Sequence, residues 1–276
     1  MFHRRCATGV CAGIIGLAVA VVFLLSQTVL AETLFDRSLR QVTSRAAQSA
    51  PDDFSFVVLG DSRGDDKVFT AALRRASAFK PLFILHGGDL SDNGTTKELD
   101  HALQLIERTV PGLPVFVVKG NHERDRALFE EKVGPRNFSI DIARLGFKLV
   151  AVDNSRNSLA KEELAYLRRQ LALRSPLAFV AMHAPPGTER WNWHTFSEGA
   201  PELIRLLSGE GVTMAFFSHV HQFDRDTIGT VPAIISGGGG APLVGRELFP
   251  GEPVYHIVVV RVRKGIAMAE MVPVQP

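Results

Sequence analysis

Six side chains that can bind metal ions follow apolar segments of this chain, each close to the point where the segment ends. In chain order they are Asp61, Asp89, Asn121, His183, His219 and His221. Carboxylate, amide and imidazole groups are common metal ligands. Residues i and i+2 of an extended segment lie on the same side, so His219 and His221 can offer two imidazoles to one point. Any one of these residues alone is more often a turn former, a helix cap or a structural histidine. Together they predict a metal site.

The apolar segments themselves predict strands of an α/β domain. FSFVVLGD, PLFILHGGD and PVFVVKGN alternate with helix-like segments around residues 67–80 and 96–109, which is typical of a largely parallel, buried sheet. FSIDIARLGFKLVAVDNS predicts two antiparallel strands. A helix is expected at about residues 160–174, before the strand LAFVAMHAP, and another at about 200–209, before the strand VTMAFFSHVH. Because ligands bind at the carboxyl ends of the strands in open α/β sheets, we expect the six side chains to converge.

The C-terminal part has a different pattern. DRDTIG, VPAIISGGGG, VYHIVVVRVR and GIAMAEMV read as short strands separated by turn residues, with no helix between them. They predict a second sheet, built from these C-terminal strands, in a layered mixed α/β domain. The glycine run in ISGGGGAPL lacks the lysine and hydroxyl of a phosphate-binding loop and instead predicts a flexible closure over the site.

The N-terminal residues predict export. MFHRR is followed by the uncharged segment CATGVCAGIIGLAVAVVFLL, which is long enough to cross a hydrocarbon core of about 30 Å as a helix. Residues 1–31 are therefore expected to be a signal peptide cleaved after Ala31 or an uncleaved signal anchor, with the rest secreted, periplasmic or anchored outside the cytoplasm. Residues 32–50 predict a tether or a loosely docked helix, and residues 51–276 the folded domain. Both cysteines, Cys6 and Cys11, lie in the leader, so the domain would bind metal through oxygen and imidazole ligands.

Composition limits the class of partner. The chain has 276 residues, 46% of them hydrophobic, and a net charge of +2 with acids and bases interspersed. This composition excludes a disordered tail protein and gives no electrostatic sign of nucleic-acid binding, so we expect a small partner.

The polar segments carry a family resemblance. GDSRG, GGDLSDNG, GNHE, MHAPP and SHVHQF occur in the order and spacing of the calcineurin-like metallophosphoesterases, a group that includes the purple acid phosphatases, and the resemblance covers about residues 54–241. It implies an αββα sandwich, in which two mixed sheets pack face to face between helices. It also implies hydrolysis of small phosphomonoesters or phosphodiesters by a dinuclear metal centre whose bridging hydroxide is the nucleophile.

The resemblance also implies the role of each site residue. One metal ion would be held by Asp61, Asp89 and His221, and the other by Asp89, Asn121, His183 and His219. Mixed oxygen and imidazole ligands favour Mn, Fe or Zn. His122, in GNHE, matches the histidine that contacts the substrate phosphate and is often assigned as the proton donor to the leaving group.

One position departs from the family pattern. Many members have a histidine ligand two residues after the first aspartate, where this chain has Arg63, which cannot coordinate a cation. Water or a carboxylate such as Asp65 or Asp92 would complete the first site, or that site would be weak. Arg63 would either grip the substrate phosphate as a fork or form a salt bridge to the acidic GDD loop. The alternative function is a catalytically silent, metal-stabilised binding or interaction protein on the outer side of the membrane.

The loops are expected to select the substrate. PPGTERWNWHTFSEG contains Trp191 and Trp193, which either form a stacking wall for a base or sugar or pack against their own domain. Arg225, in HQFDR, is a further candidate for substrate binding, or it buttresses the site. Three histidines outside the motif segments are expected to be structural, namely His86, His101 and His256.

Overall fold

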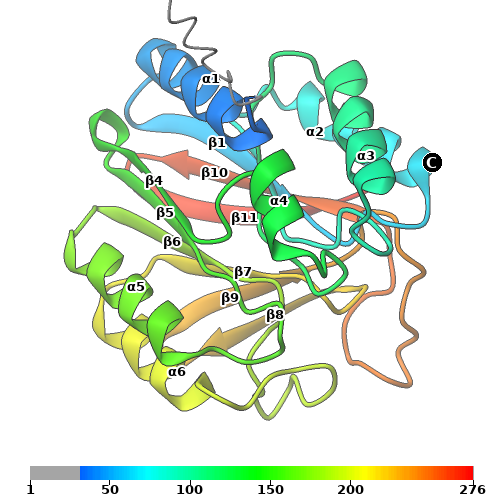
Figure 1. Ribbon diagram of the computed structural model, residues 1–276. Helices are drawn as coiled ribbons and strands as arrows, with labels where there is room; N and C mark the ends of the chain where they lie inside the picture. Colours follow the sequence, from blue (N-terminus) through cyan, green and yellow to red (C-terminus); the bar gives the residue numbers. More distant parts are fainter. Residues whose placement is uncertain (1–31, 276) are drawn as a thin grey trace, which may run out of the picture. The chain divides into compact units, whose positions relative to one another are not determined.

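Two β-sheets lie face to face between helices in the computed structural model, which describes residues 32–275 (Figure 1). The first sheet has the order β11 (Ile266–Pro273), β10 (His256–Arg263), β1 (Asp53–Leu59), β2 (Ile84–His86), β3 (Val115–Val117). The second has the order β4 (Phe138–Ile142), β5 (Phe147–Ala151), β6 (Leu177–Ala181), β7 (Met214–Phe217), β9 (Val231–Ser236), β8 (Phe223–Ile228). Both sheets are mixed: β1 to β3 are parallel, as are β5, β6, β7 and β9, and antiparallel strands complete the edges. The αββα prediction is confirmed.

Within residues 32–275, the first four α-helices begin at side chains that cap their first turns, whereas the last two have no side-chain cap. In the first half of the domain, α2 (Asp66–Ala78) and α3 (Thr96–Thr109) pack together beside the first sheet, and α4 (Arg126–Lys132) contacts α3. Asp65 caps α2, and Thr95 and Glu98 form a reciprocal capping box at α3. The helices α5 (Lys161–Ala172) and α6 (Ala200–Gly209) lie against the second sheet, and the short 3₁₀ helix η1 (Ala143–Leu145) joins β4 to β5 (Figure 1).

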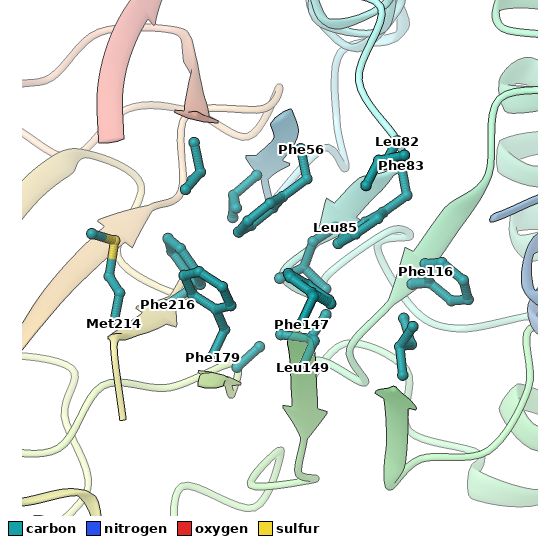
Figure 2. Close-up of a cluster of buried hydrophobic side chains, with 14 of the residues drawn as sticks. Phe56, Leu82, Phe83, Leu85, Phe116, Phe147, Leu149, Phe179, Met214 and Phe216 are labelled. Atoms are coloured by element: carbon teal, nitrogen blue, oxygen red, sulfur yellow. The ribbon is translucent and has the colours of Figure 1, made fainter. Parts of the chain in front are cut away.

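Phenylalanine rings fill the space between the two sheets. Phe56 on β1 contacts four other rings, at centroid distances of 5.1 Å to Phe83, 5.6 Å to Phe147, 5.1 Å to Phe179 and 5.8 Å to Phe216 (Figure 2). Alternate residues of the same strands face the helices instead, as period-two strands require. This rigid apolar layer fixes the two sheets against each other, and therefore fixes the loops that leave them.

The C-terminal strands do not form the second sheet by themselves, as the sequence pattern had predicted. Only β8 and β9 join it, whereas β10 returns to the first sheet and pairs antiparallel with β1, with Val58 opposite Val258. The return buries both faces of β10, whose valines contact either the inter-sheet core or the layer under α2. A nearly continuous apolar strand is stable only in such a central position.

Residues 32–50 contain a packed helix, so of the two predicted alternatives the structure has the docked helix and not the tether, and the helix is docked more tightly than expected. Helix α1 (Leu34–Gln48) buries one side chain every four residues: Leu34, Ser38, Val42 and Ala46. Ser38 Oγ donates to the Val115 carbonyl at 2.8 Å and accepts from the Val115 N–H at 3.0 Å, which closes the edge of the first sheet at β3. Because two of these four buried residues are serine and alanine, the buried face of the helix has no clear apolar pattern in the sequence.

The predicted leader lies outside the described residues. Within residues 32–275, no helix has the length and apolar character needed to span a membrane.

Candidate metal centre

The predicted ligands come from both sheets and meet at one edge of the sandwich. Asp61, Asp89 and Asn121 follow β1, β2 and β3, and the three histidines follow β6 and β7. Asp61, Asp89 and His219 have positive φ angles of 56°, 55° and 69°, so the chain turns sharply where each strand ends. Such conformations are uncommon outside glycine and occur frequently at functional sites.

One group of ligand atoms comprises Asp61, Asp89 and His221, all lying within 4.8 Å of one another. Asp61 is fully buried, and its Oδ2 accepts a hydrogen bond from the His219 N–H at 2.8 Å. Its other oxygen, Oδ1, is buried, has no hydrogen-bond partner among the described residues and lies 3.7 Å from His221 Nε2. A buried carboxylate oxygen with no donor is costly unless a cation approaches it.

A second group comprises Asp89, His183 and His219, again within 4.8 Å. His183 Nε2 lies 3.4 Å from Asp89 Oδ1, 3.1 Å from His219 Nδ1 and 2.9 Å from Asn121 Oδ1. Asp89 therefore belongs to both groups, and the structure brings all six predicted ligands together.

Backbone carbonyls orient two of the imidazoles. His183 Nδ1 is 2.9 Å from the Gly87 carbonyl, and His221 Nδ1 is 2.8 Å from the Pro242 carbonyl. A proton on each Nδ1 satisfies these contacts and leaves Nε2 as the ring atom that faces the cluster, which is the usual arrangement around a metal-binding histidine.

Burial and charge oppose each other at these residues. Burial raises the pKa of Asp61 well above its ordinary value of 3.8, and the neighbouring Asp89 carboxylate adds to the rise. Burial lowers the pKa of His219 to about 3 and that of His221 to about 4, so both rings are neutral and able to coordinate. Burial also disfavours the charged form of His183, yet the carboxylates of Asp89 and Asp61 raise its pKa to about 9.

The donor set fits metal ions. Two carboxylates share a buried pocket with three imidazoles, and one of the carboxylate oxygens has no donor. Cations would supply that missing partner and remove the repulsion between Asp61 and Asp89.

The comparisons with known proteins agree with this geometry. Residues 54–223 match the family model described as calcineurin-like phosphoesterase. The chain belongs to the calcineurin-like phosphoesterase family. This confirms the resemblance drawn from GDSRG, GGDLSDNG, GNHE, MHAPP and SHVHQF.

Three individual proteins that resemble this chain share less than 30% of its aligned residues. A protein named probable glycerophosphodiester phosphodiesterase GpdQ, from Arcobacter nitrofigilis, is 28% identical over 164 residues, which cover 52% of this chain and 58% of that relative. The chain thus spans less than two thirds of this relative's length. Purple acid phosphatase PPD1 from yellow lupin (Lupinus luteus) seeds shares the fold, with a TM-score of 0.65, 15% identity, and coverage of 80% of this chain and 51% of that one. GAP50, described as the anchor in the inner membrane complex of Plasmodium, has a TM-score of 0.61 and 14% identity, and the alignment covers 80% and 84% of the two chains.

The glycine run of this phosphoesterase domain is a packed support, and the prediction of a flexible closure was wrong. Residues 237–241 are buried, the Gly239 N–H donates to the Gly60 carbonyl at 2.9 Å, and the Ala241 N–H donates to the Asp61 carbonyl at 2.8 Å. A Cβ atom on Gly239 would collide with the Gly60 carbonyl oxygen. Glycines are needed here because two backbones touch directly beneath Asp61.

Arg63 lies against the first group of ligands. Its Nε is 3.7 Å from Asp89 Oδ2, and its Nη1 donates to Asp92 Oδ1 at 3.2 Å. The predicted salt bridge to the GDD loop does not form, because Asp65 caps α2 and Asp66 contacts His101. The described structure pairs the guanidinium with Asp89 and Asp92 and thereby ties the loop after β1 to the loop after β2.

His122 is half-buried at the rim of the cluster. Its Nδ1 lies 2.6 Å from the Asp92 carbonyl, and its Nε2 lies 3.8 Å from Asp89 Oδ2. The carbonyl contact assigns a proton to Nδ1, so Nε2 is the atom that faces the ligand cluster.

Two substrate-binding candidates lie elsewhere. Arg225 is on β8, where its Nη2 donates to the Ala269 carbonyl at 3.3 Å and its guanidinium lies over the Phe223 ring, so the structure does not bring it to the cluster. Trp191 is fully buried and its Nε1 donates to Asp224 at 2.9 Å, which makes it a core residue.

His86 and His256 are buried and hydrogen-bonded to serines, in keeping with structural roles.

Three further residues shape the site. Glu123 is buried and accepts hydrogen bonds from the backbone N–H groups of Asp89, Ser91 and Gly120, so it joins the loops after β2 and β3. In the sequence, its position as the last residue of GNHE was the feature that could have identified it. Asn154 Oδ1 accepts the N–H of His183 at 3.0 Å, and no motif marked it. His194 stacks on His219 at a ring distance of 5.3 Å and against Trp193 at 3.7 Å.

Proposed function

We propose that this domain hydrolyses phosphoric esters with a centre of two metal ions. One observation carries the proposal: Asp89 lies in two separate groups of ligand atoms, and the first group contains a buried carboxylate oxygen with no donor. Asp61, Asp89 and His221 would hold one ion, and Asp89, Asn121, His183 and His219 the other. The mixed oxygen and imidazole set favours Mn, Fe or Zn. When bound, the ions would neutralise phosphate charge and lower the pKa of the attacking water.

His122 is placed to hold the proton that the leaving group needs. With Nδ1 bonded to the Asp92 carbonyl, only Nε2 can deliver a proton to a substrate at the cluster. His122 must therefore carry protons on both nitrogens before it acts as a general acid. Glu123 keeps the loop of His122 rigid by accepting the N–H groups of Gly120 and Asp89.

The test is hydrolysis by the metal-stripped protein reloaded separately with Mn, Fe, Zn and Mg. We expect metal-dependent turnover of p-nitrophenyl phosphate or its bis ester, and a loss of about 10²- to 10⁴-fold in His122→Ala. His101→Ala is the matched control, because the His101 side chain is exposed and its hydrogen bond within residues 32–275 goes to Asp66, which is not a candidate ligand. Full activity of His122→Ala would refute its role, and absence of turnover with every metal would refute the hydrolase.

The same assay addresses the type of ester. Monoester and diester substrates are both compatible with the ligand groups. Because one relative is named a probable glycerophosphodiester phosphodiesterase, a glycerophosphodiester belongs beside the two nitrophenyl esters. The ratio of kcat/KM for monoester and diester would choose between them.

Arg63 supports a second candidate, a metal-stabilised binding protein without catalytic activity. Its guanidinium places a positive charge 3.7 Å from Asp89 Oδ2, where a cation would otherwise complete the first group. Counting bound ions by plasma emission spectrometry separates the two functions. Two ions per chain favour the hydrolase, whereas one ion or none, together with no turnover, favours the binding protein.

We also propose, from the sequence of residues 1–31, that the domain is exported or anchored outside the cytoplasm. Fractionation of cells that express the full chain tests this, with cleavage after Ala31 measured by N-terminal sequencing. Recovery of the domain in the cytoplasm alone would contradict the proposal.

A further inference from the structure

A charged cleft opens directly beside the candidate metal centre. It has a volume of about 520 Å³, and Asn121, one of the six candidate ligands, forms part of its wall. Five basic and three acidic side chains line it, which leaves an excess of two positive charges. A cleft next to a hydrolytic centre is the natural place for the part of the substrate that does not react.

Some of these charges neutralise one another. Arg136 Nη1 lies 2.6 Å from Glu163 Oε1 and 3.4 Å from Asp153 Oδ2, and Arg126 pairs with Glu130. These residues form a structural network at one end of the cleft.

Three basic residues of the cleft form no salt bridge within residues 32–275: Lys119, Arg124 and Arg156. Asp153, Glu123 and Asp89 nevertheless lie close enough to Lys119 to attract it. Glu162 is exposed and also lacks an ion pair in that range. The unpaired part of the lining therefore carries three positive charges against one negative charge. Such a surface binds an anion more strongly than a neutral group of the same size.

Lys119 is the most unusual of the three. Only 5% of this residue is exposed, yet its Nζ contacts neutral acceptors only, Ser155 Oγ at 2.9 Å and the Gly120 carbonyl at 3.3 Å. An ammonium group has three donors, so one remains for a ligand. Lysine is rarely buried without a paired charge, because desolvating the ammonium costs free energy.

The cleft and the centre share their walls. Lys119 is separated from Asn121 by one glycine, and Ser155 follows Asn154, which fixes the backbone of His183 through its Oδ1. A ligand group bound by Lys119 would thus lie in the cleft whose wall Asn121 also forms, next to a phosphate at the second group of ligands.

We propose that this cleft binds a second anionic group of the substrate, so that the preferred substrates are phosphoric esters whose alcohol part carries a carboxylate or a further phosphate. Lys119 and Arg156 supply the specificity by pairing with that group, and Arg124 adds charge at the mouth. The inference rests on the proposed hydrolysis, because it names the substrate class of the same centre.

Two nearly isosteric esters test it. In 3-phosphoglycerate a carboxylate stands where glycerol 3-phosphate has a hydroxymethyl group, so the pair differs mainly in the charge of the second group. Binding to the metal-loaded full chain is measured first by calorimetry, and hydrolysis second. We expect 3-phosphoglycerate to bind at least about tenfold more tightly than glycerol 3-phosphate, because hydrogen bonds to charged groups are stronger than those between neutral groups.

Lys119→Met and Arg156→Gln are the variants, with Arg74→Gln, an exposed arginine on α2, as the control. Each cleft variant should reduce the affinity ratio between the two esters severalfold, and the control should keep the wild-type ratio. Arg156 is exposed, so its variant remains informative if Lys119→Met fails to fold. Equal affinity of the wild type for both esters, failure to bind 3-phosphoglycerate, or an unchanged ratio in Arg156→Gln would overturn the proposal. Selective binding without turnover would support the cleft and refute the hydrolase.

Discussion

Asp61→Asn should change the sign of its effect on stability when metal is added. In the metal-free protein, the Asp61 and Asp89 ligand atoms lie within 4.8 Å, and two unit charges at that distance repel by about 3.5 kcal/mol at an effective dielectric constant of about 20. The attraction of His183 offsets part of this. Asparagine keeps an acceptor for the His219 N–H and tolerates the positive φ of 56°.

We therefore expect the variant to raise the free energy of unfolding of the chelated protein by about 2 kcal/mol, or the Tm by about 4–8 °C. The pH dependence gives a second check. Because the folded pKa of Asp61 lies above its ordinary value of 3.8, this carboxyl binds more protons in the folded state, and its own contribution to stability falls as pH rises through that pKa. The variant should lack this fall.

With metal present, the wild type should be more stable than Asp61→Asn. Ligand at 100 times its Kd stabilises a folded protein by about 2.7 kcal/mol, and a neutral amide in place of Asp61 forfeits much of that. The assay is thermal unfolding by circular dichroism, with EDTA and then with Mn²⁺. Asp153→Asn is the control, because its carboxylate pairs with Arg136 and its loss should destabilise under both conditions. Destabilisation of the chelated protein by Asp61→Asn would refute the reasoning.

Three further outcomes are expected. Metal binding at pH 7.5 should release about one proton from His183, whose pKa is raised to about 9 by neighbouring carboxylates, and apparent affinity should rise with pH up to that value; calorimetry in buffers of different ionisation enthalpy measures this. Gly239→Ala should lower the Tm by several degrees and weaken metal binding, because its methyl group meets the Gly60 carbonyl, whereas Gly209→Ala, in open space, should do neither. Arg225→Gln should keep kcat/KM within about twofold in a steady-state assay, because its guanidinium contacts the Ala269 carbonyl on β11 and the Phe223 ring on β8 and none of the candidate ligands.

The candidate ligands could be predicted from the sequence because each stands at a strand end, where residue type and position carry the information together. Asp61, Asp89 and His183 follow apolar runs whose period and length identify strands without reference to the rest of the chain. The parallel arrangement then brings their carboxyl ends to one edge.

Other features depend on contacts between distant residues, which local patterns do not encode. The pairing of β10 with β1 joins segments about 200 residues apart, and either sheet would have accepted so apolar a strand. The glycine run reads as flexible until the backbone of Gly60 is seen against it. Arg225 lies four residues after His221, but the chain has by then entered β8, which directs the side chain to the sheet edge.

The two-sheet origin of the ligands sets the order in which the centre can be assembled during synthesis. Asp61, Asp89 and Asn121 leave the ribosome long before His219 and His221, and the sheet that carries the first three stays incomplete until β10 and β11 have been made. A nascent chain therefore presents only oxygen ligands for much of its synthesis. If the proposed centre forms, selection between hard and softer metal ions by the imidazoles would begin only after His183, His219 and His221 have been made.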